Sequence, residues 1–397
     1  MKILFVVTAY YPDGAGSGRS VRNLAEGAQK AGHEVVVVRL SKDGEKSETI
    51  LNDVKIHALP IRNIYSLSGG KKKTAFKRFV WHFFDIMNPL AAWDMYKILK
   101  KEKPDIVNTN VIAGFSTSIY YAVKMRGIPL VHTMRDYYLM CPQNAMFKDG
   151  HNCPSVCGKC KPFFYVRRFA ARQVDLFLSN SEFVAEHHRK YGFLPRKKPC
   201  VVQFNMNGDD TIAKPRSLTT QGPVKFGFIG RITESKGINI LLEATQKLQT
   251  KDWELRIAGK GKDSYMKHLQ SQHNDGRIHF LGFAEPDSFY NDIDILICPS
   301  LYGEPLPRVV YESYQAAVPV IVARTGGTPE IVDDEKTGFI YSANNSDELA
   351  HLMDKLASTP DLYKQMSENA AEKAKLFTCS RITESFFKHL EMVRPQK

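Results

Sequence analysis

Short apolar runs alternate with amphipathic stretches along this chain. The first apolar run covers residues 3–7, and the second covers residues 35–38. The stretch between them carries apolar residues on one helical face: Val21, Leu24, Ala25 and Ala28. The order strand, helix, strand predicts a βαβ unit, in which the two strands are parallel.

Further apolar runs continue this rhythm in two series. The first series comprises residues 106–108, 130–133 and 176–179, and would complete one parallel sheet. The second comprises residues 226–229, 255–258, 278–281, 295–298 and 320–323. A polar, turn-rich segment at 205–223 separates the two series. We therefore predict two α/β domains of the doubly wound, Rossmann-like type, at residues 1–205 and 206–379.

The size and composition agree with two folded domains. A chain of 397 residues, 43% of them hydrophobic, is long for a single core. It has no uncharged apolar run of about eighteen residues, as a membrane span would need, and the first apolar run is too short for a signal peptide. We therefore expect a cytoplasmic protein.

The chain is basic, with 55 Lys and Arg against 42 Asp and Glu and a formal charge of +13. This charge favours partners that carry phosphate, such as sugar phosphates, an anionic membrane or nucleic acid. Because the sequence shows no nucleic-acid-binding motif, we expect no nucleic-acid partner.

The segment 302–330 is the strongest candidate for a functional site. Glu304 and Glu312 flank a predicted helix start, because Pro307 suits the first helical position. Glu304 would lie in the loop and Glu312 in the helix. Amides in a first helical turn have no partner within the helix, so this end could hold a diphosphate. The candidate amides are those of Leu306, Arg308 and Val309.

Glycines and cations gather at two predicted strand ends. Gly326 and Gly327 follow the last predicted strand, where their backbone could approach a ligand. Arg231 and Lys236 follow the first strand of the second series, and each lies beside a glycine. Cations in such a strand-to-helix turn suit phosphate binding.

These motifs resemble those of the retaining GT-B glycosyltransferases of family four, whose signature is two glutamates separated by seven residues. The resemblance covers nearly the whole chain. It implies two facing Rossmann-like domains with a cleft between them, and a C-terminal helix at 380–397 that crosses back onto the first domain.

The resemblance also implies an activity. The enzyme would transfer a hexose or N-acetylhexosamine from a nucleoside diphosphate sugar to a hydroxyl of a glycan or lipid-linked glycan. UDP is the default nucleotide and GDP the alternative. The products would be cell-surface polysaccharide or glycolipid.

By the same resemblance, Arg231 and Lys236 would neutralise the diphosphate as the glycosidic bond breaks, so no catalytic metal is expected. Glu304 would contact the transferred sugar and stabilise its developing positive charge, and Glu312 would accept hydrogen bonds from the ribose. The glycines that would line the donor are Gly16, Gly326 and Gly327.

One departure from the family concerns the acceptor side. Many relatives have His-Asp after the strand at 130–133, whereas this chain has Arg135 and Asp136. A cation thus replaces a group that exchanges protons near neutral pH. We include both residues in the catalytic site and expect Arg135 to bind phosphate or sugar; a local ion pair with Asp136 is the alternative.

Two other functions stay open at this stage. The glycine-rich segment 14–19 could be a dinucleotide fingerprint, with Arg39 beside a 2′-phosphate, as in an NAD(P)-binding Rossmann enzyme. That hypothesis leaves the motifs of the second half unexplained. The other alternative is a catalytically inactive scaffold that binds a sugar nucleotide.

Four of the seven cysteines lie close together in the sequence: Cys141, Cys153, Cys157 and Cys160. Four thiolates would satisfy a tetrahedral structural zinc site and would staple a loop that has few apolar residues. Disulfides or an iron–sulfur cluster are the alternatives.

The segment 69–84 mixes cations with large aromatic residues. This composition suits peripheral contact with an anionic membrane, here the inner face of the plasma membrane. It equally suits a helix whose aromatic residues cover the core while its lysines face water.

Overall fold

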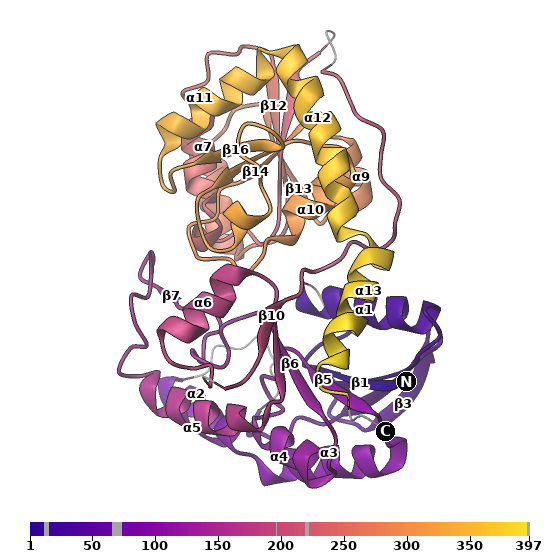
Figure 1. Ribbon diagram of the computed structural model, residues 1–397. Coiled ribbons are helices and arrows are strands. Elements are labelled where there is room, and N and C mark those ends of the chain that lie inside the picture. Colours follow the sequence, from indigo (N-terminus) through magenta and orange to yellow (C-terminus); the bar gives the residue numbers. More distant parts are fainter. Residues whose placement is uncertain (12–15, 66–73, 196, 219–221, 395–397) are drawn as a thin grey trace. The chain divides into compact units, whose positions relative to one another are not determined.

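A computed structural model describes residues 1–11, 16–65, 74–195, 197–218 and 222–394 of the chain (Figure 1). The chain forms two compact units. The first comprises Met1–Met146, Cys153–Gly208 and Cys379–Lys397, and the second comprises Phe147–Asn152 and Asp209–Thr378. Each unit has its own sheet with helices packed on it. None of the helices in the described ranges combines the length and the apolar character needed to span a bilayer.

The first unit contains an eight-stranded sheet of order β10-β9-β6-β5-β1-β2-β4-β3. Its strands are β1 (Lys2–Val7), β2 (Glu34–Leu40), β3 (Ser47–Leu51), β4 (Val54–Leu59), β5 (Ile106–Thr109), β6 (Leu130–Met134), β9 (Leu176–Ser179) and β10 (Cys200–Val202). All neighbours are parallel except β3 and β4. The prediction of a purely parallel sheet is therefore wrong at this edge. Asn52 and Asp53 both have positive φ, as a tight hairpin turn requires.

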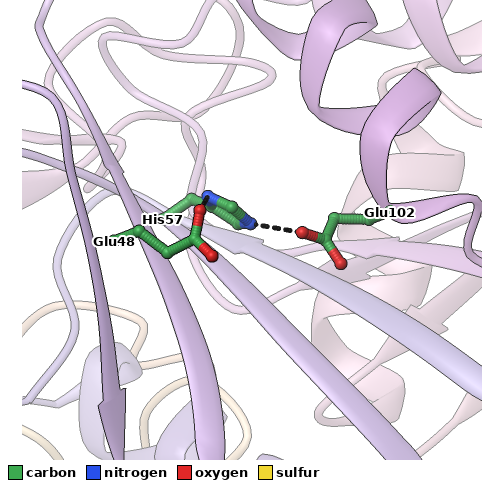
Figure 2. A group of neighbouring side chains, drawn as sticks. All are labelled: Glu48, His57 and Glu102. Atoms are coloured by element: carbon green, nitrogen blue, oxygen red, sulfur yellow. Dashed lines mark hydrogen bonds and ion pairs between the residues drawn. The ribbon is translucent and has the colours of Figure 1, made fainter.

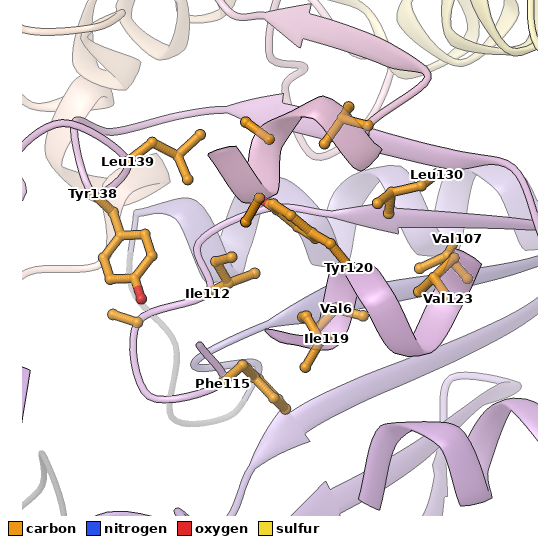
Figure 3. Close-up of a cluster of buried hydrophobic side chains, with 14 of the residues drawn as sticks. Val6, Val107, Ile112, Phe115, Ile119, Tyr120, Val123, Leu130, Tyr138 and Leu139 are labelled. Atoms are coloured by element: carbon orange, nitrogen blue, oxygen red, sulfur yellow. The ribbon is translucent and has the colours of Figure 1, made fainter. Parts of the chain in front are cut away.

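The helices of the first unit cover both faces of this sheet. They are α1 (Ser17–Lys30), α2 (Ala75–Ile86), α3 (Pro89–Glu102), α4 (Ser118–Met125), α5 (Lys161–Ala170), α6 (Glu182–Lys190) and α13 (Cys379–Glu391), with a short 3-10 turn at Ala171–Gln173. Leu4 and Val6 of β1 face a cluster formed with α3, α4 and α5, part of which Figure 3 shows around Tyr120. Ile3 and Phe5 face the opposite cluster, formed with α1 and α13. Both faces of the strand are thus buried, which explains its continuous apolar run.

The C-terminal helix α13 packs closely against α1. A Cβ atom at Gly27 of α1 would lie 2.6 Å from Thr383 Oγ1, so the two helices meet at a position without a side chain. The Phe386 ring stacks on Phe5 with 5.9 Å between centroids, and both rings are buried. Residues near the end of the chain therefore complete the core of the first unit.

The second unit contains a six-stranded, fully parallel sheet of order β13-β12-β11-β14-β15-β16. The strands are β11 (Val224–Ile229), β12 (Trp253–Ala258), β13 (Ile278–Gly282), β14 (Ile295–Cys298), β15 (Val320–Ala323) and β16 (Gly338–Tyr341). The helices are α7 (Ile238–Thr245), α8 (Asp263–Gln272), α9 (Pro286–Asn291), α10 (Arg308–Gln315), α11 (Ser346–Ala357) and α12 (Pro360–Ala374). Short 3-10 turns occur at Glu234–Lys236, Thr328–Glu330 and Lys375–Phe377. A small hairpin, β7 (Phe147–Lys148) and β8 (His151–Asn152), also belongs to this unit.

The strand order reverses between β11 and β14, which are neighbours in the sheet. The connections from these two strands run in opposite directions along the sheet, which leaves a crevice at their carboxyl ends in folds of this type. The loops that follow β11 and β14 are therefore the expected place for a ligand in this unit.

Each predicted strand is present, and β9, β14 and β15 have the predicted bounds. Helix α10 begins at Arg308, with Pro307 as its cap, so the prediction that Pro307 is the first helical residue is wrong by one position. Pro307 has ψ of 116°, an extended value outside the helical range.

We predict that Phe386→Ala lowers the stability of the first unit by about 3–5 kcal/mol, because it leaves a cavity beside β1. Urea unfolding, followed by a signal from the first unit, would measure the loss. The control is Glu391→Ala on the same helix, where the side chain is exposed and the change should be small. Equal stability of the two variants would contradict the packing of α13 on the core.

Candidate active site

In the second unit, two loops bring a lysine and a glutamate together at the carboxyl ends of β11 and β14. Lys236 lies in the 3-10 turn after β11, and Glu304 lies in the loop after β14. The Lys236 Nζ atom is 2.5 Å from Glu304 Oε1, and the Ser300 hydroxyl donates to the same oxygen. Glu304 is buried. A buried carboxylate needs such a cation and donor, because its desolvation would otherwise be too costly.

Glycine backbones allow these loops to pack closely. A Cβ atom at Gly326 would lie 2.1 Å from the Glu304 carbonyl oxygen, and Gly326 has a φ of 57°. The Gly327 amide donates to that same carbonyl at 2.8 Å. At Gly237, a Cβ atom would collide with the Pro299 carbonyl group. These glycines therefore fix the backbone that carries Glu304 and Lys236.

Glu312 lies one turn into α10 and is held by two side chains. Arg308 Nη2 is 2.7 Å from Glu312 Oε1, and the Tyr290 hydroxyl donates to Oε2 at 3.1 Å. The carboxylate is thus oriented before any ligand binds. Leu306 is buried in front of the helix, and Val309 is half-buried in its first turn.

Arg231 lies two residues after the end of β11. Its side chain is exposed and makes no hydrogen bond or ion pair with any residue that the structure describes. It is therefore accessible to an anionic ligand.

Asn152 of the β7–β8 hairpin also contributes to the loop before Glu304. Its side-chain amide donates to the Leu301 carbonyl at 3.0 Å and accepts from the Gly303 amide at 2.8 Å. Sequence reasoning missed both Asn152 and Ser300. For Ser300 a signal existed, namely a small polar residue two positions after a predicted strand, whereas Asn152 lies 149 residues or more before its partners.

In the first unit, the predicted residues lie at the ends of α1 and β6. Gly16 precedes α1 with a φ of 56°, and its carbonyl accepts from the Ser20 amide. Arg135 Nε donates to Asn110 Oδ1 at 2.9 Å, and Asp136 accepts from the Tyr138 amide. Burial raises the pKa of Asp136 to about 6, although the Tyr138 amide and Arg167 oppose this shift. Residues 14 and 15 of the glycine-rich segment lie outside the described ranges.

A buried polar network that the sequence did not predict supports the loop after β6. Asp85 accepts from the Tyr138 hydroxyl at 2.7 Å and from the Gly114 amide at 2.7 Å. Arg167 lies 3.3 Å from Asp85 and 3.8 Å from the centre of the Tyr138 ring. Burial raises the pKa of Asp85 to about 6, against the opposing effect of Arg167. A charged residue inside the aromatic run at 79–86 was the available signal.

A second carboxylate group lies at the β3 edge of the first sheet (Figure 2). The group comprises Glu48, His57 and Glu102, whose possible ligand atoms lie within 4.8 Å of one another. In the described part of the chain, this is the group of histidine, cysteine or acidic residues that lies close enough together to hold a metal ion. His57 Nε2 is 2.8 Å from Glu102 Oε1. Three ammonium groups already neutralise the two carboxylates: those of Lys2, Lys55 and Lys101. This is an ion-pair network that joins β3 and β4 to α3, and it does not fit a metal ion.

Each of the two units matches its own model of a glycosyltransferase domain. Residues 14–203 match the model described as "Glycosyltransferase Family 4", and residues 209–373 match the model described as "Glycosyl transferases group 1". The chain belongs to glycosyltransferase family 4. It is an α/β glycosyltransferase of the GT-B type, so the predicted fold class and enzyme class are confirmed.

This glycosyltransferase resembles several other proteins. It is 30% identical, over 83% of its length and 87% of the other's, to an uncharacterized 42.6 kDa protein of the cps region of Klebsiella pneumoniae. It is 28% identical to the putative colanic acid biosynthesis glycosyltransferase WcaL of Escherichia coli, over 45% of this chain and 47% of WcaL. Its fold matches that of Anabaena HepE, solved with UDP-glucose, with a TM-score of 0.74, 18% identity and coverage of 99% and 100%.

We predict that Glu102→Gln destabilises the first unit at neutral pH. Burial raises the pKa of Glu102, but hydrogen bonds from Lys55, Lys2 and His57 outweigh it and hold the pKa at about 2. A depressed carboxylate pKa stabilises the fold above the unfolded-state pKa, and this stability is lost as pH falls toward the folded-state value. We expect a difference on the order of 2 kcal/mol at pH 7 that shrinks between about pH 4.5 and 2.

Urea unfolding of wild-type protein and variant across that pH range would measure this difference. The matched control is Glu34→Gln, because Glu34 also pairs with Lys2 but its side chain is 64% exposed. A constant difference at all pH values would contradict the assigned charge state of Glu102.

Proposed function

We propose that this glycosyltransferase is a retaining enzyme that transfers a hexose or N-acetylhexosamine from a UDP-sugar to a hydroxyl of a glycan or lipid-linked glycan. The observation that carries the proposal is the contact of Lys236 and Ser300 with the buried Glu304 at the strand ends of the second unit. The UDP-glucose complex of HepE supports UDP over GDP. The relatives from the cps region and from colanic acid biosynthesis support a role in making cell-surface polysaccharide.

In the proposed reaction, the bond between the anomeric carbon of the sugar and the diphosphate oxygen breaks, and the diphosphate keeps the electron pair. Lys236 and Arg231 stabilise the added negative charge, which is the electrostatic task that a metal ion performs elsewhere. No catalytic metal is therefore part of the proposal. The acceptor oxygen attacks the same face that the diphosphate leaves, and its proton passes to a diphosphate oxygen.

Donor binding would also change the partner of Lys236. In the free protein the ammonium group neutralises Glu304 at 2.5 Å. A bound diphosphate competes for this cation, and Glu304 is then free to stabilise positive charge on the sugar. Glu312 would accept the ribose hydroxyls, and the amides of Leu306, Arg308 and Val309 would hold the diphosphate. Gly326 and Gly327 would line the donor.

On the first unit, Gly16 would face the donor phosphate, Arg135 would bind phosphate or sugar of the acceptor, and Asp136 would orient the attacking hydroxyl. The half-buried Asp136 suits this task because burial raises its pKa to about 6, so that it accepts a hydrogen bond more readily than an ordinary surface carboxylate. The family match leaves no support for the dinucleotide-binding alternative.

We predict that Lys236→Ala and Glu304→Gln each lower the transfer rate by about 10²–10³-fold, because each removes charge stabilisation that is needed in the transition state. Binding should separate the two variants: Lys236→Ala weakens UDP binding, whereas Glu304→Gln binds UDP about as well as the wild type. Calorimetry with UDP, GDP and ADP in the presence of EDTA would measure binding, and release of UDP from UDP-sugars would measure turnover.

The matched control is Glu234→Ala, an exposed residue in the same 3-10 turn as Lys236. Wild-type turnover in Glu304→Gln would refute the catalytic role. UDP binding without turnover of any UDP-sugar, in the presence of lipid-linked acceptors, would instead favour the inactive scaffold.

The structure adds an argument for membrane contact. Helix α2 exposes Phe76, Phe79, Phe83 and Phe84, while Trp81 of the same helix is buried. The adjacent helix α5 exposes Tyr165 and Phe169. Its Phe163 ring packs edge-on against Phe79 of α2, with 6.3 Å between the ring centroids. Exposed cations accompany these rings: Lys77, Arg78, Lys161 and Arg168. Exposed aromatic residues amid cations suit the surface of an anionic bilayer, where lipid-linked acceptors are found.

We predict that Phe76→Ser combined with Phe83→Ser weakens binding to vesicles of phosphatidylcholine with about one-third phosphatidylglycerol by about tenfold, since two exposed rings that would insert into the bilayer interface are lost. Co-sedimentation at low and high salt would measure this, and binding should fall with salt. Ile50→Ser is the control, because Ile50 is 75% exposed at the β3 edge of the sheet. Equal vesicle binding of the wild type, the double variant and Ile50→Ser would show that the aromatic surface of α2 and α5 does not bind the membrane. The basic residues Lys71, Lys72 and Lys73 lie outside the described ranges.

A further inference from the structure

The loop between β6 and α5 brings four cysteines around one small cavity. Cys141 is buried, Cys153 and Cys160 are half-buried, and Cys157 is exposed. All four line a cavity of about 10 Å³, together with Met140 and Met146. These residues lie in the first unit and contribute neither to the Lys236–Glu304 group nor to the exposed aromatic surface.

The contacts among the sulfur atoms centre on Cys160. The Cys157 and Cys160 Sγ atoms are 3.2 Å apart. Interaction with the Cys160 thiol also lowers the pKa of the Cys141 thiol to about 6. The backbone supports this arrangement, because the Cys160 amide donates to the Cys157 carbonyl at 2.8 Å. The Cys153 amide likewise donates to the Met146 carbonyl at 2.7 Å. A turn that presents two sulfurs of a Cys-x2-Cys pair is a common half of a zinc site.

The loop needs a stabilising element of this kind. Asn144, Met146 and Asp149 all have positive φ, which is costly for residues with a side chain. The start of the loop, as far as Met146, is anchored in the first core cluster, whereas residues 147–160 reach this cluster only through Cys153, Val156 and Cys160. This second part of the loop has few apolar anchors, so it gains order when its cysteines share a metal ion.

We propose that Cys141, Cys153, Cys157 and Cys160 bind one structural Zn²⁺ ion, which displaces the thiol protons and occupies the cavity between them. No three of these sulfurs lie within 4.8 Å of one another in this structure. Zinc–sulfur bonds of about 2.3 Å place the sulfurs of a tetrahedral site about 3.8 Å apart. Metal binding therefore draws the Cys141 and Cys153 side chains inward and separates Cys157 from Cys160.

Four cysteines that close one cavity suit a site without an open coordination position. Such a site stabilises the fold and does not take part in the transfer reaction. The zinc ion would order the loop that follows Arg135 and Asp136. It would therefore affect the proposed acceptor site only through the shape of this loop.

The test uses the full chain, purified under reducing conditions without chelators. Elemental analysis should find one zinc per chain in the wild type and none in the Cys157→Ser, Cys160→Ser double variant. Cys200→Ser and Cys379→Ser are the matched controls, because both cysteines lie in the first unit outside the cavity, and they should retain one zinc.

A second measurement keeps the proposal testable if the double variant does not fold. Wild-type protein refolded with Co²⁺ should show the visible bands of tetrahedral cobalt and the near-ultraviolet charge-transfer band of thiolate ligands. UDP binding should be the same for zinc-loaded and zinc-free protein, which separates this test from that of the proposed function.

Three results would overturn the proposal. These are purified protein without zinc whose cysteines all react as free thiols, a mass two daltons lower that indicates a disulfide, and iron with acid-labile sulfide in place of zinc.

Discussion

The ion pair between Lys236 and Glu304 is the constraint on which the second unit depends. Glu304 is buried at the point where the strand order reverses, and a carboxylate in this place is tolerable only with a cation beside it. The loops that carry the two residues must therefore approach closely, and they do so at glycines where a side chain would collide with backbone. The ion pair thus requires the close approach of the two loops, and this approach requires the glycines.

The same dependence underlies the response to the donor that we propose. In the proposed mechanism, Lys236 is shared between the internal carboxylate of Glu304 and an incoming diphosphate, so donor affinity and sugar activation are parts of one equilibrium. Glu312 differs in this respect, because Arg308 and Tyr290 hold it from within α9 and α10. In the proposed mechanism Glu312 keeps its partners, whereas Glu304 gives up its cation to the diphosphate.

Much of this fold could be predicted because the strands buried on both faces leave continuous apolar runs. The runs that became β9, β14 and β15 are such cases, and all of their residues are buried. Strand β3 could not be found in this way, because the residues from Ser47 to Ile50 are exposed and its pairing comes from the turn at Asn52 and Asp53. Strand β3 therefore forms because it pairs with β4, and its own residues show no apolar pattern that would predict it.

The candidate site shows the same division. Lys236 and Glu304 each follow a readable strand, so their meeting could be anticipated from the rule that ligands bind at strand ends. Asn152 could not be anticipated, because its partners are distant in sequence and a single polar residue carries no period. Asp85 is conspicuous as a charged residue in an aromatic run, but its distant partners could not be read from the sequence. The aromatic run at 76–84 was ambiguous for a related reason: helical spacing shows that one face differs from another, but it does not show which face meets the core.

The β7–β8 hairpin has a consequence for how this polypeptide could be divided. Residues 147–152 belong by their contacts to the second unit, but the chain on both sides of them belongs to the first unit. The C-terminal segment from Cys379 also belongs to the first unit. The backbone thus passes from one unit to the other four times, after residues 146, 152, 208 and 378. Neither half is one uninterrupted stretch of sequence, so no single cut yields two complete modules. Gene fusions that exchange the second unit between family members would have to include the six-residue hairpin.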